Sequence, residues 1–244
     1  MKQSFTCFIL LFYLLGAIPA PAQKEKETKA LQARFQKGNA FIKNGDPKSA
    51  IQEFNEIIKL YPRVATAYYD RAIAYDQLKN FVQSVADYST TLLINPQYAE
   101  AHNNRGIAYA NLKEYYSAIY DFSVAITLNI RFAEAYNNRG YYNCMIGKYE
   151  KSIPDFDRAI HLNPSYGFAY NNRGFAYFNL KKYSQALADY NKAIEKNPKN
   201  SLAFLNRGNC QELMGDHEKA CLDWLKAFKL GDKEAGEKLR KLCN

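Results

Sequence analysis

The sequence predicts an all-α protein made of repeated helical hairpins, and three regularities predict it. The same 34-residue skeleton begins six times, at residues 31, 65, 99, 133, 167 and 201. Within each repeat, small residues occupy positions 8 and 20, and an aromatic residue at position 24 precedes an apolar residue at position 28, as on the buried face of a helix. Proline at position 32 ends a helix in four of the repeats. Each repeat is therefore expected to fold as helix, turn, helix.

The six repeats occupy residues 31–64, 65–98, 99–132, 133–166, 167–200 and 201–234. Small residues let the two helices of a repeat approach closely, and at position 8 they are Gly38, Ala72, Gly106, Gly140, Gly174 and Gly208. Bulky residues fill the space between stacked helices, and at position 24 they are Phe54, Tyr88, Phe122, Phe156, Tyr190 and Trp224. The chain is thus predicted to be an array in which each repeat packs on its neighbours.

This pattern of small, small, aromatic, alanine and proline residues at positions 8, 20, 24, 27 and 32 resembles that of the tetratricopeptide repeat (TPR) family over about residues 31–234. The resemblance implies a right-handed superhelical α-solenoid of six helix-turn-helix TPR units. Departures are local: Asn143 and Gln211 replace the family's aromatic residue at position 11, and Ile130 and Asp232 replace its proline at position 32.

Residues 1–22 are predicted to be a signal peptide. Lys2 gives a positive start, residues 5–18 form an apolar run, and the Ala-Pro-Ala sequence at 20–22 provides small residues at a cleavage point before Gln23. An uncleaved anchor is the alternative, although the run is shorter than the ~20 residues that cross a bilayer. The mature chain is expected to be exported, periplasmic or secreted or associated with the envelope, without membrane insertion.

Two short segments flank the array. Residues 23–30 are charged and lack an apolar face, which predicts an N-terminal tether or the frayed start of the first helix. Residues 235–244 are predicted to form a C-terminal capping helix, because Leu239 and Leu242 can cover the last repeat, which has no further repeat to stack on.

Charge and motif content indicate a protein without chemistry of its own. The net charge of +9 is spread over turns and helix ends, so nucleic-acid binding is not expected. His102, His161 and His217 fall at different positions of three repeats, without metal-ligand spacing. The sequence has no glycine-rich phosphate loop and no nucleophile elbow. We therefore predict no catalytic residues, no metal, no cofactor and no enzymatic activity.

Four cysteines follow the predicted signal peptide: Cys144, Cys210, Cys221 and Cys243. Exported proteins can form disulfides, and a bridge from Cys243 to Cys210 or to Cys221 would fix the capping helix to the last repeat. In the alternative, all four are small buried apolar residues. Spacing does not decide between these, because a bridge needs Cα atoms within about 7 Å.

Positions 7 and 23 carry opposite charges in every repeat and are equally far from the turn, so they are placed to pair. The predicted structural ion pairs are Arg71 with Asp87, Arg105 with Asp121, Arg139 with Asp155, Arg173 with Asp189, and Arg207 with Asp223. We expect these pairs to set the stacking register rather than to bind an anion, because each arginine has its own carboxylate.

In the TPR family, the first helices of successive units line a concave groove. The resemblance therefore implies a peptide-binding groove that contains Asn103, Asn104, Asn137, Asn138, Tyr141, Asn171, Asn172, Phe175, Phe178 and Asn206. A row of side-chain amides can bond the backbone of an extended peptide whatever its sequence. In the alternative, the aromatic residues pack on neighbouring repeats and the asparagines bond the backbone of an adjacent repeat. Clamping of an acidic C-terminal tail is disfavoured, because no repeat has lysine at position 5.

Two functions follow from this reading. The first is a non-enzymatic scaffold whose concave groove binds a peptide or extended segment of a partner protein. The second is a structural subunit of an envelope complex, or a self-associating array, that uses its convex face or its edges. The sequence leaves the identity of the partner and the oligomeric state open.

Overall fold

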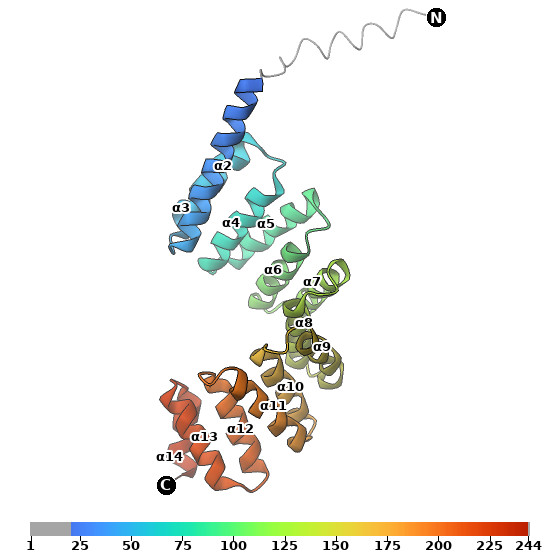
Figure 1. The fold of residues 1–244 in the computed structure, drawn as a ribbon, viewed down its shortest axis with the longest axis vertical. Coiled ribbons are helices and arrows are strands. Elements are labelled where there is room, and N and C mark those ends of the chain that lie inside the picture. The colour runs from blue at the N-terminus through green and yellow to red at the C-terminus, as the bar shows by residue number, and fades with distance from the viewer. Residues whose placement is uncertain (1–20, 244) are drawn as a thin grey trace, which may run out of the picture. The chain divides into compact units, whose positions relative to one another are not determined.

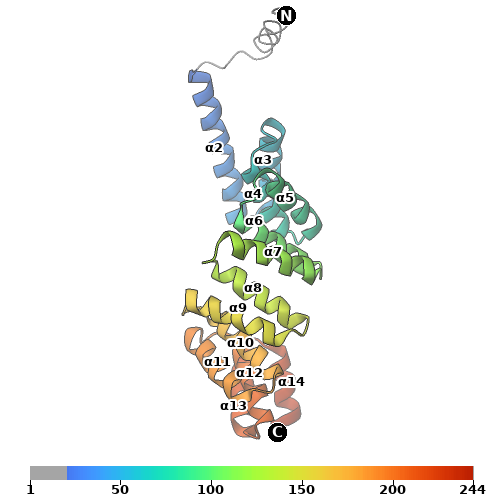
Figure 2. The same ribbon diagram turned by 90° about the vertical axis from the view of Figure 1, so that its right-hand side faces the viewer.

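The computed structural model describes residues 21–243, with side chains from residue 28 onward. The predicted signal peptide, apart from its last two residues, lies outside the described residues. The chain divides after Asn80 into an N-terminal body and a C-terminal body that begins at Phe81. The described residues contain helices and turns but no strand, which confirms the predicted all-α class (Figures 1 and 2).

The helices follow one another in pairs. The N-terminal body contains α2 (Pro21–Lys43), α3 (Pro47–Leu60) and α4 (Ala65–Gln77). The C-terminal body contains α5 (Phe81–Ile94), α6 (Ala99–Asn111), α7 (Tyr115–Leu128), α8 (Ala133–Met145), α9 (Tyr149–Leu162), α10 (Gly167–Asn179), α11 (Tyr183–Lys196), α12 (Ser201–Leu213), α13 (His217–Lys229) and α14 (Lys233–Leu242). The first helices of repeats two to six begin on the first residue of the predicted repeat.

Each hairpin turn needs one residue in the left-handed backbone conformation at position 15. Three repeats have glycine there, for which this conformation carries no steric cost. The other three have Lys79, Lys113 and Lys181, with φ of 57°, 66° and 59°. Lys113 and Lys181 tolerate an unfavourable backbone because each lies between two helices that pack on each other within the C-terminal body, α6 on α7 and α10 on α11.

The ends of the array differ in detail from the sequence-based boundaries. Helix α2 begins at Pro21, so residues 23–30 continue the first helix in the structure. The capping helix α14 begins at Lys233, two residues before its predicted start, because the Asp232 side chain accepts a 2.9 Å hydrogen bond from the backbone N–H of Ala235. That bond satisfies one of the free donors at a helix start.

Glycine at position 8 allows close packing within a repeat. A Cβ atom on Gly140 would lie 2.8 Å from the buried ring of Phe156, and one on Gly106 would lie 2.7 Å from the ring of Phe122. These separations are below van der Waals contact. The aromatic residue at position 24 therefore fills the space that the missing side chain leaves.

In the C-terminal body, the first helices of successive repeats contact each other directly: α6 packs on α8, α8 on α10 and α10 on α12. Each second helix packs instead on the first helices of its own repeat and of the next, as α7 does on α6 and α8. The first helices therefore lie closer together than the second helices do, and the array bends toward them. Their outward sides form the inner surface of this body.

Candidate functional site

One face of each first helix points away from the hairpin. Positions 2, 6, 9 and 13 share that face, since residues three or four apart are neighbours on a helix. We call these positions on α6, α8, α10 and α12 the inner stripe. Apolar side chains that are 37% to 58% exposed on this stripe are Ile107, Tyr141, Met145, Phe168, Leu202 and Leu213.

Asparagine side chains at positions 5 and 6 form a ladder between repeats. In repeats four to six, the amide of the position-6 asparagine donates to the position-5 amide oxygen of the preceding repeat, as from Asn138 to Asn103 at 3.1 Å and from Asn172 to Asn137 at 3.0 Å. The last rung runs from Asn206 to Asn171 at 3.1 Å.

The ladder divides the predicted groove asparagines into two classes. Asn103, Asn137 and Asn171 at position 5 are buried, at 2% to 6% exposure, and bonded to the next repeat. They lie beneath the surface because one residue along a helix is a rotation of about 100°. Their bonds join side chain to side chain, whereas the alternative reading of the sequence expected bonds to backbone.

Position-6 asparagines reach the inner surface and are held there. Asn104, Asn138, Asn172 and Asn206 are all partly exposed. A primary amide has two N–H donors and an oxygen with two lone pairs. Each bond of the ladder uses one N–H of the donating residue. Asn138, Asn172 and Asn206 can therefore form further hydrogen bonds, and the bond to the buried position-5 asparagine fixes their orientation.

The three aromatic residues predicted for the groove differ in how far their side chains are buried against neighbouring rings. Tyr141 is exposed, with its ring edge-on to Tyr142 at 5.0 Å between centroids. Phe175 is partly buried against Tyr149, at 6.3 Å between ring centroids. Phe178 packs on Tyr183 and also lines a pocket of about 250 Å³ beside Trp224. Tyr141 is thus the most available of the three.

Arginine at position 7 bonds side chains of two repeats: the position-23 carboxylate of its own repeat and the position-25 side chain of the preceding repeat. Arg139 donates from Nε and Nη2 to the two carboxylate oxygens of Asp155, at 2.9 and 2.6 Å, and from Nη1 to Ser123 of the preceding repeat at 3.3 Å. Three more pairs have this two-bond form: Arg105 with Asp121, Arg173 with Asp189, and Arg207 with Asp223. The geometry matches a role in stacking register.

The basic residues at position 7 of the first two repeats, and the polar partners at position 25, extend this pattern. In the N-terminal body, Arg71 bonds Asn55 at 2.5 Å, and Lys37 bonds Glu53 at 2.5 Å. The predicted partner of Arg71, Asp87, belongs to the C-terminal body. The sequence reading missed the position-25 partners, which are polar in the five repeats that a further repeat follows: Asn55, Ser89, Ser123, Asp157 and Asn191. The last repeat, with no arginine to receive, has Leu225 there.

Buried carboxylates show the electrostatic effect of their partners. Burial raises the pKa of Asp121, but hydrogen bonds from Arg105 and His102 outweigh it and leave the pKa below its usual value. His102 is accordingly a buried histidine at a seam, with Nδ1 3.0 Å from Asp121. In the N-terminal body, Asp70 replaces asparagine at position 6, and burial raises its pKa to about 6 despite a hydrogen bond from Asn39.

The cysteines fall into two pairs. Cys221 on α13 and Cys243 at the end of α14 form a disulfide with Cα atoms 5.8 Å apart, which is one of the two bridges that the sequence allowed. Cys144 and Cys210 are buried, and burial raises the pKa of each thiol to about 11. These two thiols behave as small apolar residues. Within residues 28–243, His217 joins the two bridged cysteines in a group of potential metal ligands.

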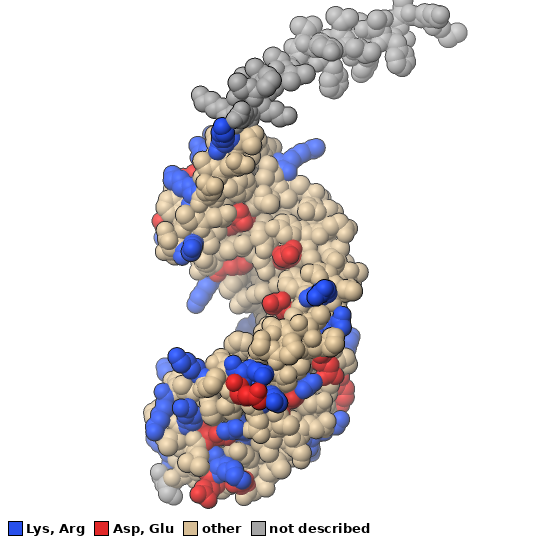
Figure 3. Space-filling view, viewed as in Figure 1, with Lys and Arg blue, Asp and Glu red and all other residues tan. Residues whose placement is uncertain are grey.

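Charged groups of both signs occur together on the visible surface. On the face of the C-terminal body drawn in Figure 3, Lys and Arg atoms are interspersed with Asp and Glu atoms. This is the distribution that the spread of lysines along the sequence indicated. Among residues 21–243, none of the helices combines the length and the apolar character that a bilayer crossing demands.

Comparisons with solved structures identify the same architecture elsewhere. PilF from Pseudomonas aeruginosa superposes with a TM-score of 0.76 at 18% identity, over 88% of this chain and 98% of that chain. A tetratricopeptide repeat protein from Parabacteroides merdae gives a TM-score of 0.67 at 25% identity, over 88% and 84% of the two chains. The TPR protein YrrB gives 0.61 at 22% identity, over 78% and 98%.

Sequence comparison agrees. A search of curated proteins gives no match. Family models described as tetratricopeptide repeat match residues 35–92, 133–166, 168–200 and 189–221, which together are more than half of the 244 residues. The chain therefore belongs to the tetratricopeptide repeat family, whose arrays generally act as non-enzymatic scaffolds for protein–protein interaction.

Proposed function

We propose that the inner stripe of the C-terminal body binds an extended peptide segment of a partner protein. The observation that carries the proposal is the combination of amides held in place by a buried ladder with exposed apolar side chains on the same helix faces. A surface with both features offers bonds to a peptide backbone and pockets for its side chains.

The spacing of the stripe suits an extended chain. Packed helices lie about 8–10 Å apart, and an extended chain advances about 3.3 Å per residue. Successive position-6 amides would therefore meet every third residue of the peptide. Each such bond contributes about 1 kcal/mol net, so the amides set direction and register while the apolar anchors supply most of the affinity.

Position 2 of the stripe changes character along the body. Glu100 and Glu134 are exposed there in repeats three and four, whereas Phe168 and Leu202 are exposed there in repeats five and six. We therefore expect a peptide with a basic residue toward α6 and α8 and with apolar residues toward α10 and α12.

The test compares two variants that each carry three substitutions to serine. In the first, Tyr141→Ser, Phe168→Ser and Leu202→Ser are combined, which removes exposed anchors without touching the asparagine ladder. A peptide selected against the unmodified chain from a random library is labelled, and its Kd is measured by fluorescence anisotropy. We expect at least a tenfold higher Kd, because interface anchors typically cost more than about 1 kcal/mol each when removed.

The control variant changes exposed apolar residues of second helices: Leu93→Ser, Tyr120→Ser and Leu222→Ser. We expect no change in its Kd. The reverse pattern, loss of binding only in the control, would contradict groove binding and favour the second function, an envelope subunit or self-associating array that uses the outer face. The exposed Leu93, at 83%, and Tyr120, at 67%, are what give that alternative its basis.

YrrB is described as a TPR protein with an unusual peptide-binding site. At 22% identity the likeness establishes only the fold, so the case for this chain depends on its own stripe and ladder.

We also propose that the chain is exported. The apolar run at residues 5–18 supports this, and so does the Cys221–Cys243 disulfide, since structural disulfides are typical of oxidising compartments. Intact-mass analysis of the protein from cell fractions should give a mature chain that begins at Gln23. A chain that retains residues 1–22 in the membrane fraction would instead identify an uncleaved anchor.

A further inference from the structure

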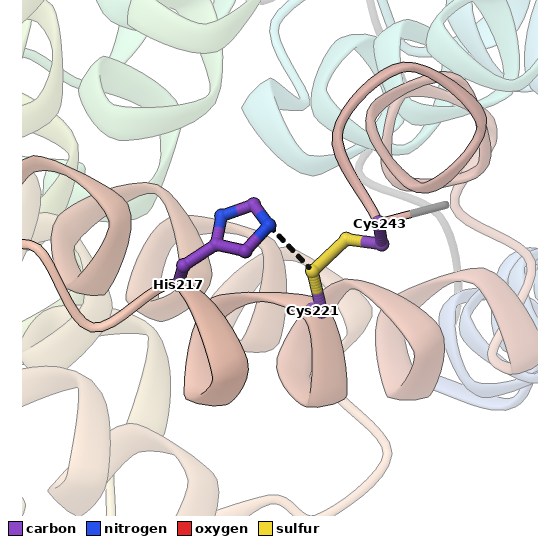
Figure 4. A group of neighbouring side chains, drawn as sticks. All are labelled: His217, Cys221 and Cys243. Carbon is purple, nitrogen blue, oxygen red and sulfur yellow. Dashed lines mark hydrogen bonds between the residues drawn. A yellow bond between two sulfur atoms is a disulfide. The ribbon is translucent and has the colours of Figure 1, made fainter.

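We propose that the reduced form of the C-terminal cap binds one thiophilic divalent cation such as Zn²⁺, with His217, Cys221 and Cys243 as ligands, so that the disulfide and the metal exclude each other. Figure 4 shows the His217 ring directed at the Cys221 sulfur on the same helix, with Cys243 reaching it from the end of α14. The spacing along the sequence did not indicate this site, because the third ligand comes from another helix.

The distances suit tetrahedral coordination. The Nε2 atom of His217 lies 3.7 Å from Sγ of Cys221, and the three potential ligand atoms all lie within 4.8 Å of one another. Zinc bonds of about 2.1 Å to nitrogen and about 2.3 Å to sulfur place two tetrahedral ligands about 3.6 Å apart. The His–Cys edge is thus already in place, and reduction has to separate only the two sulfurs.

The histidine is oriented by a carboxylate. Nδ1 of His217 lies 2.8 Å from a carboxylate oxygen of Glu212, which can accept its proton; in that tautomer the lone pair of Nε2 faces the sulfur. A carboxylate, an imidazole and a metal in this order are a common arrangement in zinc sites. With two thiolates and one imidazole from the protein, a fourth position remains for water.

Packing that does not involve the disulfide keeps Cys243 close. The buried Gly236 of α14 lies against Phe228, where a Cβ would come within 2.7 Å of the ring, and Lys238 lies over the Trp224 ring at 5.6 Å. Asp232 caps the start of the helix. Cutting the S–S bond should therefore leave both thiols at the same junction.

The chemistry balances with a dithiol as the reductant. It transfers two electrons and two protons to the disulfide, becomes a cyclic disulfide itself, and leaves two thiols on Cys221 and Cys243. Metal binding then releases the two thiol protons to solvent. His217 is exposed and both cysteines are partly exposed, so reductant and metal can reach the site.

The experiment uses Co²⁺ as a coloured substitute for Zn²⁺. The full chain is reduced with a dithiol, freed of reductant without air, and titrated with Co²⁺ while thiolate-to-cobalt absorption is recorded. We expect one Co²⁺ per reduced chain, none per oxidised chain, and displacement by Zn²⁺. His217→Ala should weaken binding more than Glu212→Gln, for which the second-sphere role predicts a loss of about 10- to 100-fold.

Matched controls separate this site from other groups. His161→Ala removes an exposed histidine of α9, and Cys144→Ala with Cys210→Ala removes the two buried thiols. Both should leave the stoichiometry unchanged. In the unmodified reduced chain, Zn²⁺ should protect Cys221 and Cys243 from alkylation, as mapped by mass spectrometry.

Three results would overturn the proposal: no metal uptake by a reduced chain that keeps its helical circular dichroism, uptake unaffected by His217→Ala, or loss of helical structure on reduction. The last would show that the disulfide alone holds the cap in place. None of these results bears on peptide binding, which is measured on the oxidised chain.

Discussion

The Arg139–Asp155 pair offers a direct test of what holds the repeats in register. The side chain of Asp155 is 8% exposed and that of Arg139 is 25% exposed, and two hydrogen bonds join them. Asp155→Ala would leave a mostly buried guanidinium with Ser123 as a hydrogen-bond partner and the Tyr136 ring beside it. Removing one member of a buried pair costs about 3–5 kcal/mol. Since Arg139 can turn partly toward water, we expect the lower end, about 3 kcal/mol.

The assay is urea unfolding followed by two signals. Circular dichroism reports all helices, while fluorescence of the single tryptophan, Trp224, reports the last repeat. Repeat arrays can lose cooperativity at a weakened seam. We therefore expect Asp155→Ala to lower the circular dichroism midpoint and to separate it from the fluorescence midpoint.

The matched control is an exposed ion pair of similar length. Lys192 donates to Glu195 at 2.7 Å on the surface of α11. Glu195→Ala should produce no measurable change, because surface pairs contribute little. If Asp155→Ala were as mild as this control, the position 7 to position 23 pairs would not be what fixes the stacking, and the reasoning would fail.

Three further outcomes are expected. Gly140→Ala should destabilise the chain by about 1–3 kcal/mol in urea unfolding, because the new Cβ would overlap the Phe156 ring; an unchanged midpoint would refute the close approach. Lys113→Gly should stabilise it by about 1 kcal/mol, since φ of 66° disfavours a side chain; a lower midpoint would contradict this. Asp70 has a folded pKa of about 6, above its unfolded value of about 3.9, so its contribution to stability is present below pH 4 and is lost as pH rises through 6. The Asp70→Asn variant should therefore have a higher urea midpoint than the unmodified chain, and the difference should be larger at pH 7 than at pH 4.5. Equal differences at the two pH values would exclude the raised pKa.

Some features of the site could be predicted from the sequence, and others could not. The pairing of Arg139 with Asp155 follows from equal distances to the turn, a purely local relation. The position-25 partners were also visible as polar residues in five repeats. The sixth has Leu225, where no arginine of a following repeat needs a partner. By contrast, the assignment of Asn137 to the interior and Asn138 to the surface needs the rotation of the helix against its neighbour.

The sequence by itself determined the repeat period, the starts of the first helices in repeats two to six and the close contacts inside each hairpin, because these depend on residues a few positions apart within one 34-residue unit. Only the tertiary structure decided what happens between units. Cys243 bonds Cys221 rather than Cys210 because Cys210 is buried against Tyr190, whereas Cys221 lies where α14 ends. Which amides remain available to a partner is likewise set by how one repeat is rotated on the next, a relation that no single repeat contains.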